Sequence, residues 1–297
     1  MSGQPLIREH QVSDAAAMPY AVAVTDDSAV WATLAQGDAV VRRAADGSLT
    51  TIPLGEGGRP LLLVATDQDT VWVTESVGNR LVHVGPEGVR AAVPVPTPEA
   101  HPFGIATTGT GELWFTEMAS DLIGHVDAHG RVREFPTGAA GGMPSLIACA
   151  DDAVWFTLNQ AHAVGCLRAD HEQVEILPLP TQGAGPVGIT AAPDGAGWFV
   201  QIGAGLIGRV DAAGTLVEHA LPDRQSKPHA IAADPAGGCW FTLWGSNQVG
   251  HIGDDGAITL AELPTPDSQP HGLAVAPDWT VWVALEPGRL AEVSAQR

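Results

Sequence analysis

The chain has 297 residues, and 34 Asp and Glu against 14 Lys and Arg give it a formal net charge of −20 at pH 7. This charge argues against nucleic acid or an anionic membrane as a partner, because both require clustered positive charge. No run approaches the ~18 apolar residues of a membrane helix. Three cysteines do not make a disulfide framework, and the N-terminus has no basic-then-apolar signal segment, so a cytoplasmic protein is expected.

The first predicted element is a strand at Leu6–Val12, and a sevenfold repeat follows it. One column of the repeat is proline, at Pro19, Pro60, Pro102, Pro144, Pro186, Pro228 and Pro270. A second column is tryptophan, at Trp31, Trp72, Trp114, Trp155, Trp198, Trp240 and Trp282. The prolines are 41 residues apart once and then 42 apart five times, so the chain is built from seven equivalent units.

Each unit predicts four short strands, as in "PFGIATT", "GELWFTE", "DLIGHVDA" and "RVREFPTG" of the third unit. Gly, Asp and Asn clusters separate these segments, as hairpin turns require. Four strands in about 42 residues are typical of a β-propeller blade, with the tryptophans as core between blades. The cysteines Cys149, Cys166 and Cys239 fall within strands and are expected to be buried.

The two ends of the chain predict how the ring closes. The seventh unit stops after its third strand, "GRLAEVSAQR", whereas the N-terminal segment Leu6–Val12 resembles an unattached fourth strand. Pairing of this segment with the strand near Leu290–Val293 would remove an open sheet edge. The sequence therefore predicts an all-β fold: a seven-bladed β-propeller forming one domain over residues 1–297, expected to be a monomer.

The copies differ at positions that should meet at one face near the axis. The residues after the prolines are Tyr20, Leu61, Phe103, Ser145, Val187, His229 and His271. Three residues after the tryptophans stand Leu34, Glu75, Glu117, Leu158, Gln201, Leu243 and Leu285, and Glu286 follows the last. Aromatic and aliphatic side chains beside histidines predict a pocket for a partly apolar ligand with a reactive corner.

His229 and His271 occupy equivalent positions of adjacent units, so the ring should place them side by side near Glu286. Two imidazoles and a carboxylate can hold a cation, or one histidine can act as a base. A solvated loop is the alternative for either histidine alone. Glu75 and Glu117 either face the pocket or cap a turn, and Trp244 is a candidate for stacking on a ligand.

These motifs resemble the virginiamycin B lyase (streptogramin B lyase) family over essentially the whole chain. The resemblance is carried by "PFGI…LWFTE…LIGHV…REF", "PVGIT…WFV…LIGRV", "PHAI…WFT.WG.NQVG" and "PHGL…VW.A.E". The two Pro-His motifs with the following Trp-x-x-x-Glu are its most specific part. It implies a Mg²⁺-dependent carbon–oxygen lyase that confers antibiotic resistance by opening cyclic depsipeptides at a threonine ester, without hydrolysis.

By motif position the resemblance implies that His271 is catalytic, with Glu286 beside it. His229 would lie at the metal and substrate corner, and Tyr20, Phe103 and Trp244 would contact a cyclic depsipeptide substrate, together with Glu75 and Glu117. The implied Mg²⁺ ligands are Glu286, His229 and, weakly, Gln269. Glutamate is typical of the family before the last Pro-His, so the neutral Gln269 reduces the negative charge that would hold the metal.

Two other classes of function remain open from the residues alone. A propeller lactonase or esterase would need several Asp, Asn or Glu ligands converging on the axis, and few are present. A non-catalytic propeller that binds carbohydrate or peptide would keep the pocket and tolerate the loss of either histidine. The fold itself does not distinguish these functions.

Overall fold

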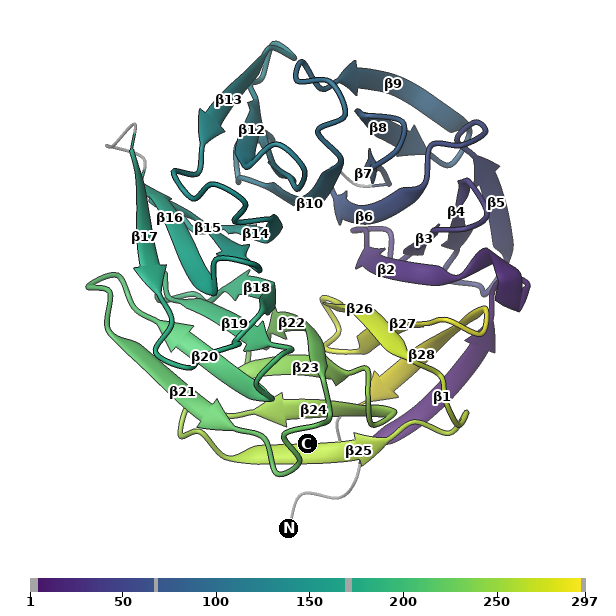
Figure 1. The fold of residues 1–297 in the computed structure, drawn as a ribbon. Coiled ribbons are helices and arrows are strands. Elements are labelled where there is room, and N and C mark those ends of the chain that lie inside the picture. Colours follow the sequence, from purple (N-terminus) through teal and green to yellow (C-terminus); the bar gives the residue numbers. More distant parts are fainter. Residues whose placement is uncertain (1–4, 67–68, 169–172, 295–297) are drawn as a thin grey trace.

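The computed structural model describes residues 5–66, 69–168 and 173–294. Its strands form seven four-stranded antiparallel sheets arranged as the blades of a closed ring (Figure 1). The predicted seven-bladed β-propeller is therefore confirmed. Among the described residues the single helical element is a 3-10 turn, η1 (Ala15–Ala17). None of these residues belongs to a helix long and apolar enough to span a membrane.

Six blades are continuous in sequence, and the bounds of their strands follow. Blade 1 has β2 (Pro19–Val24), β3 (Val30–Leu34), β4 (Ala39–Arg43) and β5 (Leu49–Pro53); blade 2 has β6 (Pro60–Ala65), β7 (Val71–Glu75), β8 (Arg80–Gly85) and β9 (Gly88–Pro94). Blade 3 has β10 (Pro102–Thr107), β11 (Leu113–Glu117), β12 (Leu122–Val126) and β13 (Val132–Pro136); blade 4 has β14 (Pro144–Cys149), β15 (Ala153–Leu158), β16 (Ala163–Arg168) and β17 (Val174–Pro178). Blade 5 has β18 (Pro186–Ala191), β19 (Gly197–Gln201), β20 (Leu206–Val210) and β21 (Leu216–Ala220); blade 6 has β22 (Pro228–Ala233), β23 (Cys239–Leu243), β24 (Gln248–Ile252) and β25 (Ile258–Glu262).

Blade 7 joins the two ends of the chain. It combines β26 (Pro270–Val275), β27 (Val281–Leu285) and β28 (Arg289–Ser294) with the N-terminal β1 (Leu6–Gln11). β1 pairs antiparallel with β28 from Leu6↔Ser294 to Gln11↔Arg289, which confirms the predicted closure. Val12 lies just beyond the strand and donates its N–H to the Gly288 carbonyl at 2.9 Å. The purple β1 lies at the edge of the yellow blade in Figure 1.

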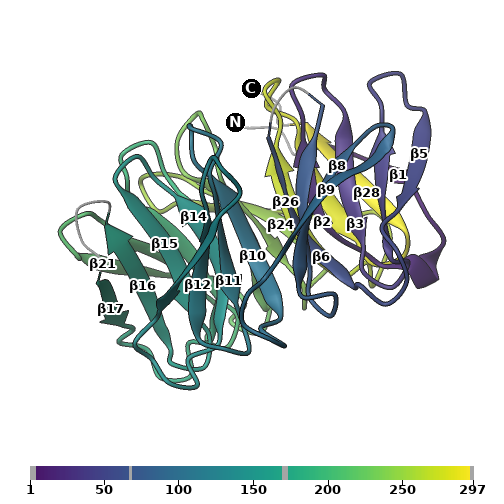
Figure 2. The same ribbon diagram turned by 90° about the horizontal axis from the view of Figure 1, so that it is seen from above.

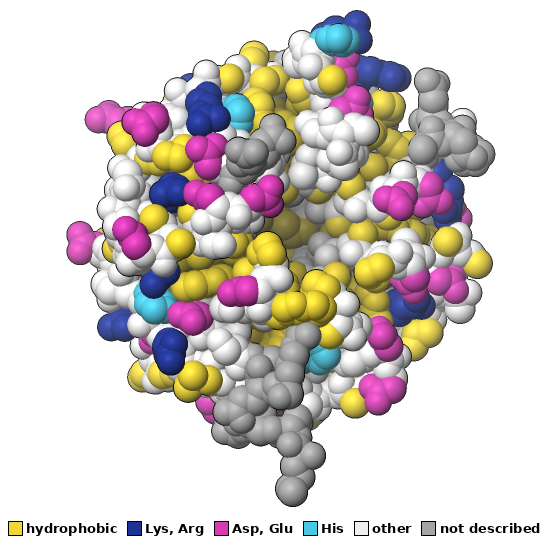
Figure 3. Space-filling view, turned by 180° about the vertical axis from the view of Figure 1, so that it is seen from behind, with side chains coloured by type: hydrophobic (Ala, Val, Ile, Leu, Met, Phe, Trp, Pro, Cys, Tyr) yellow, Lys and Arg dark blue, Asp and Glu magenta, His cyan; other side chains and the backbone are white. Residues whose placement is uncertain are grey.

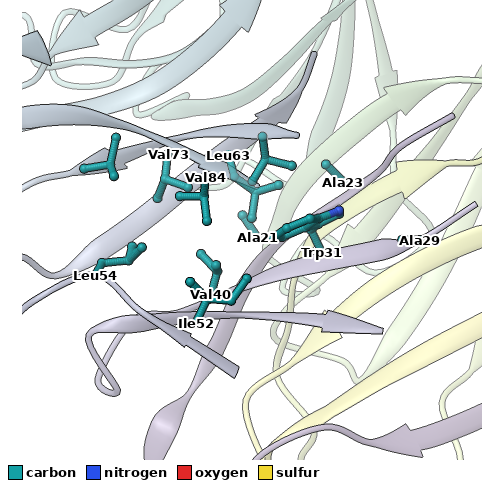
Figure 4. Packing of buried hydrophobic residues seen from close by; sticks show 12 residues of the cluster. Ala21, Ala23, Ala29, Trp31, Val40, Ile52, Leu54, Leu63, Val73 and Val84 are labelled. Carbon is teal, nitrogen blue, oxygen red and sulfur yellow. The ribbon is translucent and has the colours of Figure 1, made fainter. Parts of the chain in front are cut away.

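The core lies between neighbouring blades. Trp31 is fully buried and packs with residues of blades 1 and 2, including Val73 and Val84 (Figure 4). Third-strand glycines leave room for aromatic side chains of the second strand: a Cβ on Gly124 of β12 would lie 2.0 Å from the ring of Phe115, its partner on β11 of the same blade. Similar clusters recur around the ring, so the tryptophan column acts as predicted, as core between blades.

The two broad faces of the ring differ from its packed interior. The side view shows blades of similar height set around the axis (Figure 2). The face turned away in Figure 1 is hollowed at its centre, where hydrophobic side chains surround the hollow and acidic side chains are scattered outside it (Figure 3).

All three cysteines are free, and Cys166 and Cys239 are buried whereas Cys149 is half-buried.

Candidate active site

A β-bulge in the first strand of each blade sets the direction of the residue that follows the proline. In blade 7 the pairing of β26 with β27 shifts register between Pro270 and Leu273, and the other six blades show the same irregularity. A bulge bends its strand and re-aims side chains. The residues of this column consequently approach one another: the ring of Tyr20 in blade 1 lies 6.4 Å from that of Phe103 in blade 3, although blade 2 lies between these blades in sequence.

A threonine column, which sequence reasoning missed, supports the bulges. Five blades place a threonine two residues after the repeated tryptophan, at Thr33, Thr74, Thr116, Thr157 and Thr242. Each hydroxyl accepts an N–H from the first strand of its own blade. Each also donates to the carbonyl of the post-proline residue in the next blade. Through this bond, 2.8 Å long, Thr242 of blade 6 holds the backbone of His271. The recurrent Trp-x-Thr was the available signal.

Three rings meet at the seam of blades 6, 7 and 1. The imidazoles of His229 and His271 lie edge to face, with centroids 4.7 Å apart. The phenol ring of Tyr20 lies 4.5 Å from His271 and 5.9 Å from His229. The structure thus brings together the two histidines that the repeat places at equivalent positions. Phe103 extends this cluster on the other side of Tyr20.

Glu286 completes the cluster through a short hydrogen bond. Its Oε1 lies 2.5 Å from Nε2 of His271, which is only 6% exposed. Nδ1 of His271 is buried and has no hydrogen-bond partner among the described residues. With the Nε2 proton shared with the carboxylate, Nδ1 is therefore the bare acceptor of this imidazole.

Burial controls the protonation of the cluster. It lowers the pKa of His271 to about 4, and burial together with the nearby His271 lowers the pKa of His229 to about 3. Burial raises the pKa of the Tyr20 hydroxyl to about 12 and also raises that of Glu286, a shift that the Trp244 indole partly opposes. Both imidazoles are therefore neutral near pH 7, the form in which a histidine can accept a proton.

An unusual turn sets the position of Glu286. The turn between β27 and β28 has three residues, Glu286–Gly288, whereas the equivalent turn of blade 6 has four, Trp244–Asn247. In blade 6 the Trp244 N–H donates to the Lys227 carbonyl, one residue before the proline. In blade 7 the Glu286 N–H instead donates to Ser268, two residues before the proline, at 3.0 Å. The shorter turn therefore changes the backbone anchor of the carboxylate that reaches His271.

Trp244 follows the repeated tryptophan of blade 6 by four residues, as Glu286 does in blade 7, although their backbone anchors differ. It is half-buried, and the Lys227 ammonium lies 5.0 Å from the centre of its indole ring. The indole lies near enough to the Glu286 carboxylate to affect its pKa, but its N–H makes no hydrogen bond of ordinary geometry with a described residue. Trp244 therefore lies near both the Lys227 ammonium and the Glu286 carboxylate that bonds to His271.

The structure does not bring Glu75 and Glu117 to this cluster. Both side chains are fully buried within their own blades. Glu75 forms an ion pair with Arg80, and Glu117 accepts a hydrogen bond of 2.8 Å from Ser120. Residues alternate between the two faces of a strand, so a position three after the tryptophan points away from the tryptophan's own face. Their placement favours a structural role.

The cluster provides little for a metal ion by itself. Among the described residues, no three His, Cys, Asp or Glu side chains are grouped so that they could hold a cation. Glu286 offers one carboxylate, and Gln269, which is half-buried, precedes the proline of the same blade. Mg²⁺ is often held by one or two carboxylates, with water and substrate oxygens completing its shell. The residues present therefore fit a Mg²⁺ site only where a substrate supplies further oxygens.

A closed propeller in which a buried imidazole bonds to a half-buried carboxylate defines a propeller enzyme with an acid–base site. Within that class the chain belongs to the virginiamycin B lyase family, whose model matches residues 5–293, and it is a lyase. A virginiamycin B lyase of Nocardia farcinica (strain IFM 10152) is 44% identical over 216 residues, which make up 72% of this chain and 74% of that protein.

Solved structures agree with this assignment. The crystal structure of a virginiamycin B lyase from Staphylococcus aureus superimposes with a TM-score of 0.92 at 30% identity, covering 98% of this chain and 99% of that one. A streptogramin B lyase structure matches with a TM-score of 0.92 at 31% identity, over 98% of both chains. A catalytically inactive histidine-to-alanine variant of the Staphylococcus aureus enzyme, solved with quinupristin, matches with a TM-score of 0.91.

Proposed function

We propose that this lyase linearises cyclic depsipeptide antibiotics of the group B streptogramin class by β-elimination at their threonine ester. The observation that carries the proposal is the neutral, buried His271 bonded to Glu286 at the mouth of the ring, in a chain of this family. The quinupristin complex of the related Staphylococcus aureus variant supports the substrate class. The aromatic rings of Tyr20, Phe103 and Trp244 suit the apolar parts of such a ligand.

In the proposed reaction His271 removes the α-proton of the threonine residue. Glu286 bonds to Nε2 in the resting protein, so it must move off this nitrogen, and the imidazole proton must lie on Nδ1, before Nε2 can accept the substrate proton. His229 and Tyr20 pack against His271 from two sides and keep its ring from turning away. Their contact also excludes water, which keeps the imidazole in its neutral form, the form that can accept a proton.

Glu286, together with Gln269 of the same blade, would hold Mg²⁺ when substrate is bound. The ion would stabilise negative charge that builds up on the threonine carbonyl as the α-proton leaves. His229 was also predicted as a ligand, but its imidazole is enclosed by Tyr20 and His271 and Mg²⁺ prefers oxygen, so a packing role is favoured for it.

Mass spectrometry tests the proposal directly. The protein is incubated with quinupristin and Mg²⁺, and the product is analysed before and after fragmentation. Elimination gives a linear peptide of unchanged mass, whereas hydrolysis by an esterase adds one water. A non-catalytic binding propeller would leave the antibiotic cyclic.

His271→Ala is the companion variant for this test. It should lower turnover by roughly 10²–10⁴-fold, as expected for the loss of a general base, and should change quinupristin binding little. A His271→Ala protein that eliminates at nearly the original rate would remove His271 from this role.

A further inference from the structure

Lys227 is the only lysine of a chain that carries 34 acidic residues. It directly precedes Pro228 and His229, at the mouth end of blade 6, and its side chain is exposed. Its ammonium lies 5.0 Å from the centre of the Trp244 ring. In so acidic a protein, a single lysine ammonium over an aromatic ring near the His271–Glu286 pair is a candidate binding partner for an anion.

The backbone of Lys227 is fixed beside that of Trp244. Its φ of 51° is in the left-handed region, which residues other than glycine seldom adopt. Its carbonyl accepts the N–H of Trp244 at 3.1 Å, so the two residues are tied together at the edge of the blade. The flat indole then supports the ammonium through a cation–π contact. The side chain is thereby held near the site although it remains open to solvent.

The nearest carboxylate of the cluster is already engaged elsewhere. Glu286 is bonded to His271, and no ion pair of Lys227 with a described acidic residue is present. Arg59, the other cation of the column before the prolines, lies on the opposite side of the cluster, where it acts on Tyr20. Lys227 is therefore the cation on the Trp244 side that is available to an incoming anion.

We propose that Lys227 receives the carboxylate leaving group of the elimination, an inference that rests on the proposed function. As the α-C–H bond breaks, its electron pair forms the Cα=Cβ double bond. The Cβ–O bond breaks at the same time and leaves its electron pair on the ester oxygen, which becomes a carboxylate. The proton goes to His271. The Lys227 ammonium offsets the charge that develops on the leaving oxygen, a form of electrostatic stabilisation that acts more strongly in the transition state than in the ground state.

Three variants and two measurements test this inference. Lys227→Met keeps the length and apolar stem of the side chain but removes its charge, and Lys227→Arg keeps the charge. Arg90→Met is the matched control, since it removes one positive charge from the outer part of blade 2, on strand β9. For each protein, kcat and KM are measured with quinupristin, and calorimetry measures binding of the linear product as its free acid and as its carboxamide.

Lys227→Met should lower kcat by about 10-fold or more with little change in KM, below the ~10²–10³-fold cost of losing a buried oxyanion donor, because water can reach this site. The unaltered protein should bind the acid about 10-fold more tightly than the carboxamide, and Lys227→Met should bind the two equally. Lys227→Arg should retain most of both properties, and Arg90→Met all of both.

The outcomes separate the inference from the proposed function. An unaltered protein that leaves quinupristin cyclic contradicts both. A protein that opens the ring equally fast with and without the Lys227 charge contradicts the inference alone, as does equal binding of the acid and the carboxamide to the unaltered protein. A Lys227→Met protein that only melts at a lower temperature, with unchanged kinetics, would show that the cation–π contact is merely structural.

Discussion

Two columns of the repeat run around the same ring and serve different ends. The tryptophan column hardly varies: its side chains pack between blades, and Trp31 and Trp155 are completely buried. The post-proline column varies from blade to blade and meets at the axis, where His229 and His271 touch each other and Tyr20. The uniform tryptophan column stabilises the packing between blades. The ring brings the variable post-proline residues together, so that different side chains from different blades form one site.

A third column shows that variation alone does not mark a site. The residues three after the tryptophans include Glu75, Glu117 and Gln201, yet all three are fully buried inside their blades. The side-chain amide of Gln201 donates a hydrogen bond of 2.7 Å to Glu218 in blade 5. Glu117 lies close to Glu134, which is the residue of blade 3 equivalent to Glu218. What distinguishes the functional column is the direction of its side chains, which the bulge after each proline determines.

The largest expected effect comes from opening the ring on which both columns depend. Deletion of residues 1–11 removes β1, its pairing with β28 and the hydrogen bond from the Thr265 N–H to Glu9. Blade 7 would then expose a strand edge. The deletion should remove a large part of the roughly 5–15 kcal/mol that keeps a domain folded, so thermal unfolding should move to a much lower temperature throughout the chain. Unfolding at an unchanged temperature would show that β1 is a dispensable addition.

The next largest effect separates the two columns directly. Trp155→Ala should lower the free energy of unfolding by about 3–5 kcal/mol, because it leaves a cavity between blades 4 and 5. His271→Ala, by contrast, should change turnover far more than stability. Urea unfolding and quinupristin turnover of both variants give the comparison. Equal losses of stability in the two proteins would contradict the division between a structural and a functional column.

The sequence predicts the ring well because the same residue spacing recurs in seven units. The number of blades, the four strands and the pairing of Leu6–Val12 with the last strand all follow from spacing, although β1 ends one residue earlier, at Gln11. The adjacency of His229 and His271 follows in the same way. Equivalent positions of adjacent blades must be neighbours, whatever the details of their contacts.

The rest of the site depends on features that occur once. Counting residues separates Glu75 and Glu117 from the face of the tryptophan, but it did not show their contacts with Arg80 and Ser120, which depend on the folded blade. The three-residue turn at Glu286 and the burial of the histidines depend on three-dimensional packing. The threonine column could have been found, but its bond from Thr242 to the next blade at His271 crosses between units that sequence spacing treats as separate.

A smaller effect tests the third column through pH. Burial raises the pKa of Glu117 to about 7, with the nearby Glu134 as a further cause and the Ser120 hydrogen bond opposing it. The folded protein then holds this proton over a range in which the unfolded chain has lost it, so stability should fall as pH rises from about 4.5 to 7. Glu117→Gln copies the Gln201–Glu218 pair and should raise the free energy of unfolding above pH 7 by roughly 1–3 kcal/mol.

Urea unfolding at pH 5 and pH 8 measures this effect. Glu175→Gln is the matched control, since it makes the same change on the exposed face of β17 in blade 4. The Glu117 variant should gain on the original protein mainly at pH 8, and the control should show no such difference. A gain of the same size at both pH values would mean that Glu117 is ionised in the folded protein throughout.

The smallest expected effect concerns the residue beside the catalytic pair. Gln269 has a φ of 46°, is half-buried and follows Ser268, whose carbonyl accepts the Glu286 N–H. Gln269→Glu adds a second carboxylate next to Glu286 and should lower the Mg²⁺ concentration needed for half-maximal turnover by about 10-fold, through a direct contact or through metal-bound water. Met143→Glu places the same charge at the equivalent position of blade 4, where φ is 54°, and should leave the Mg²⁺ requirement unchanged. If both variants shift it equally, the effect belongs to the overall charge of the mouth; if neither does, Gln269 does not reach the metal.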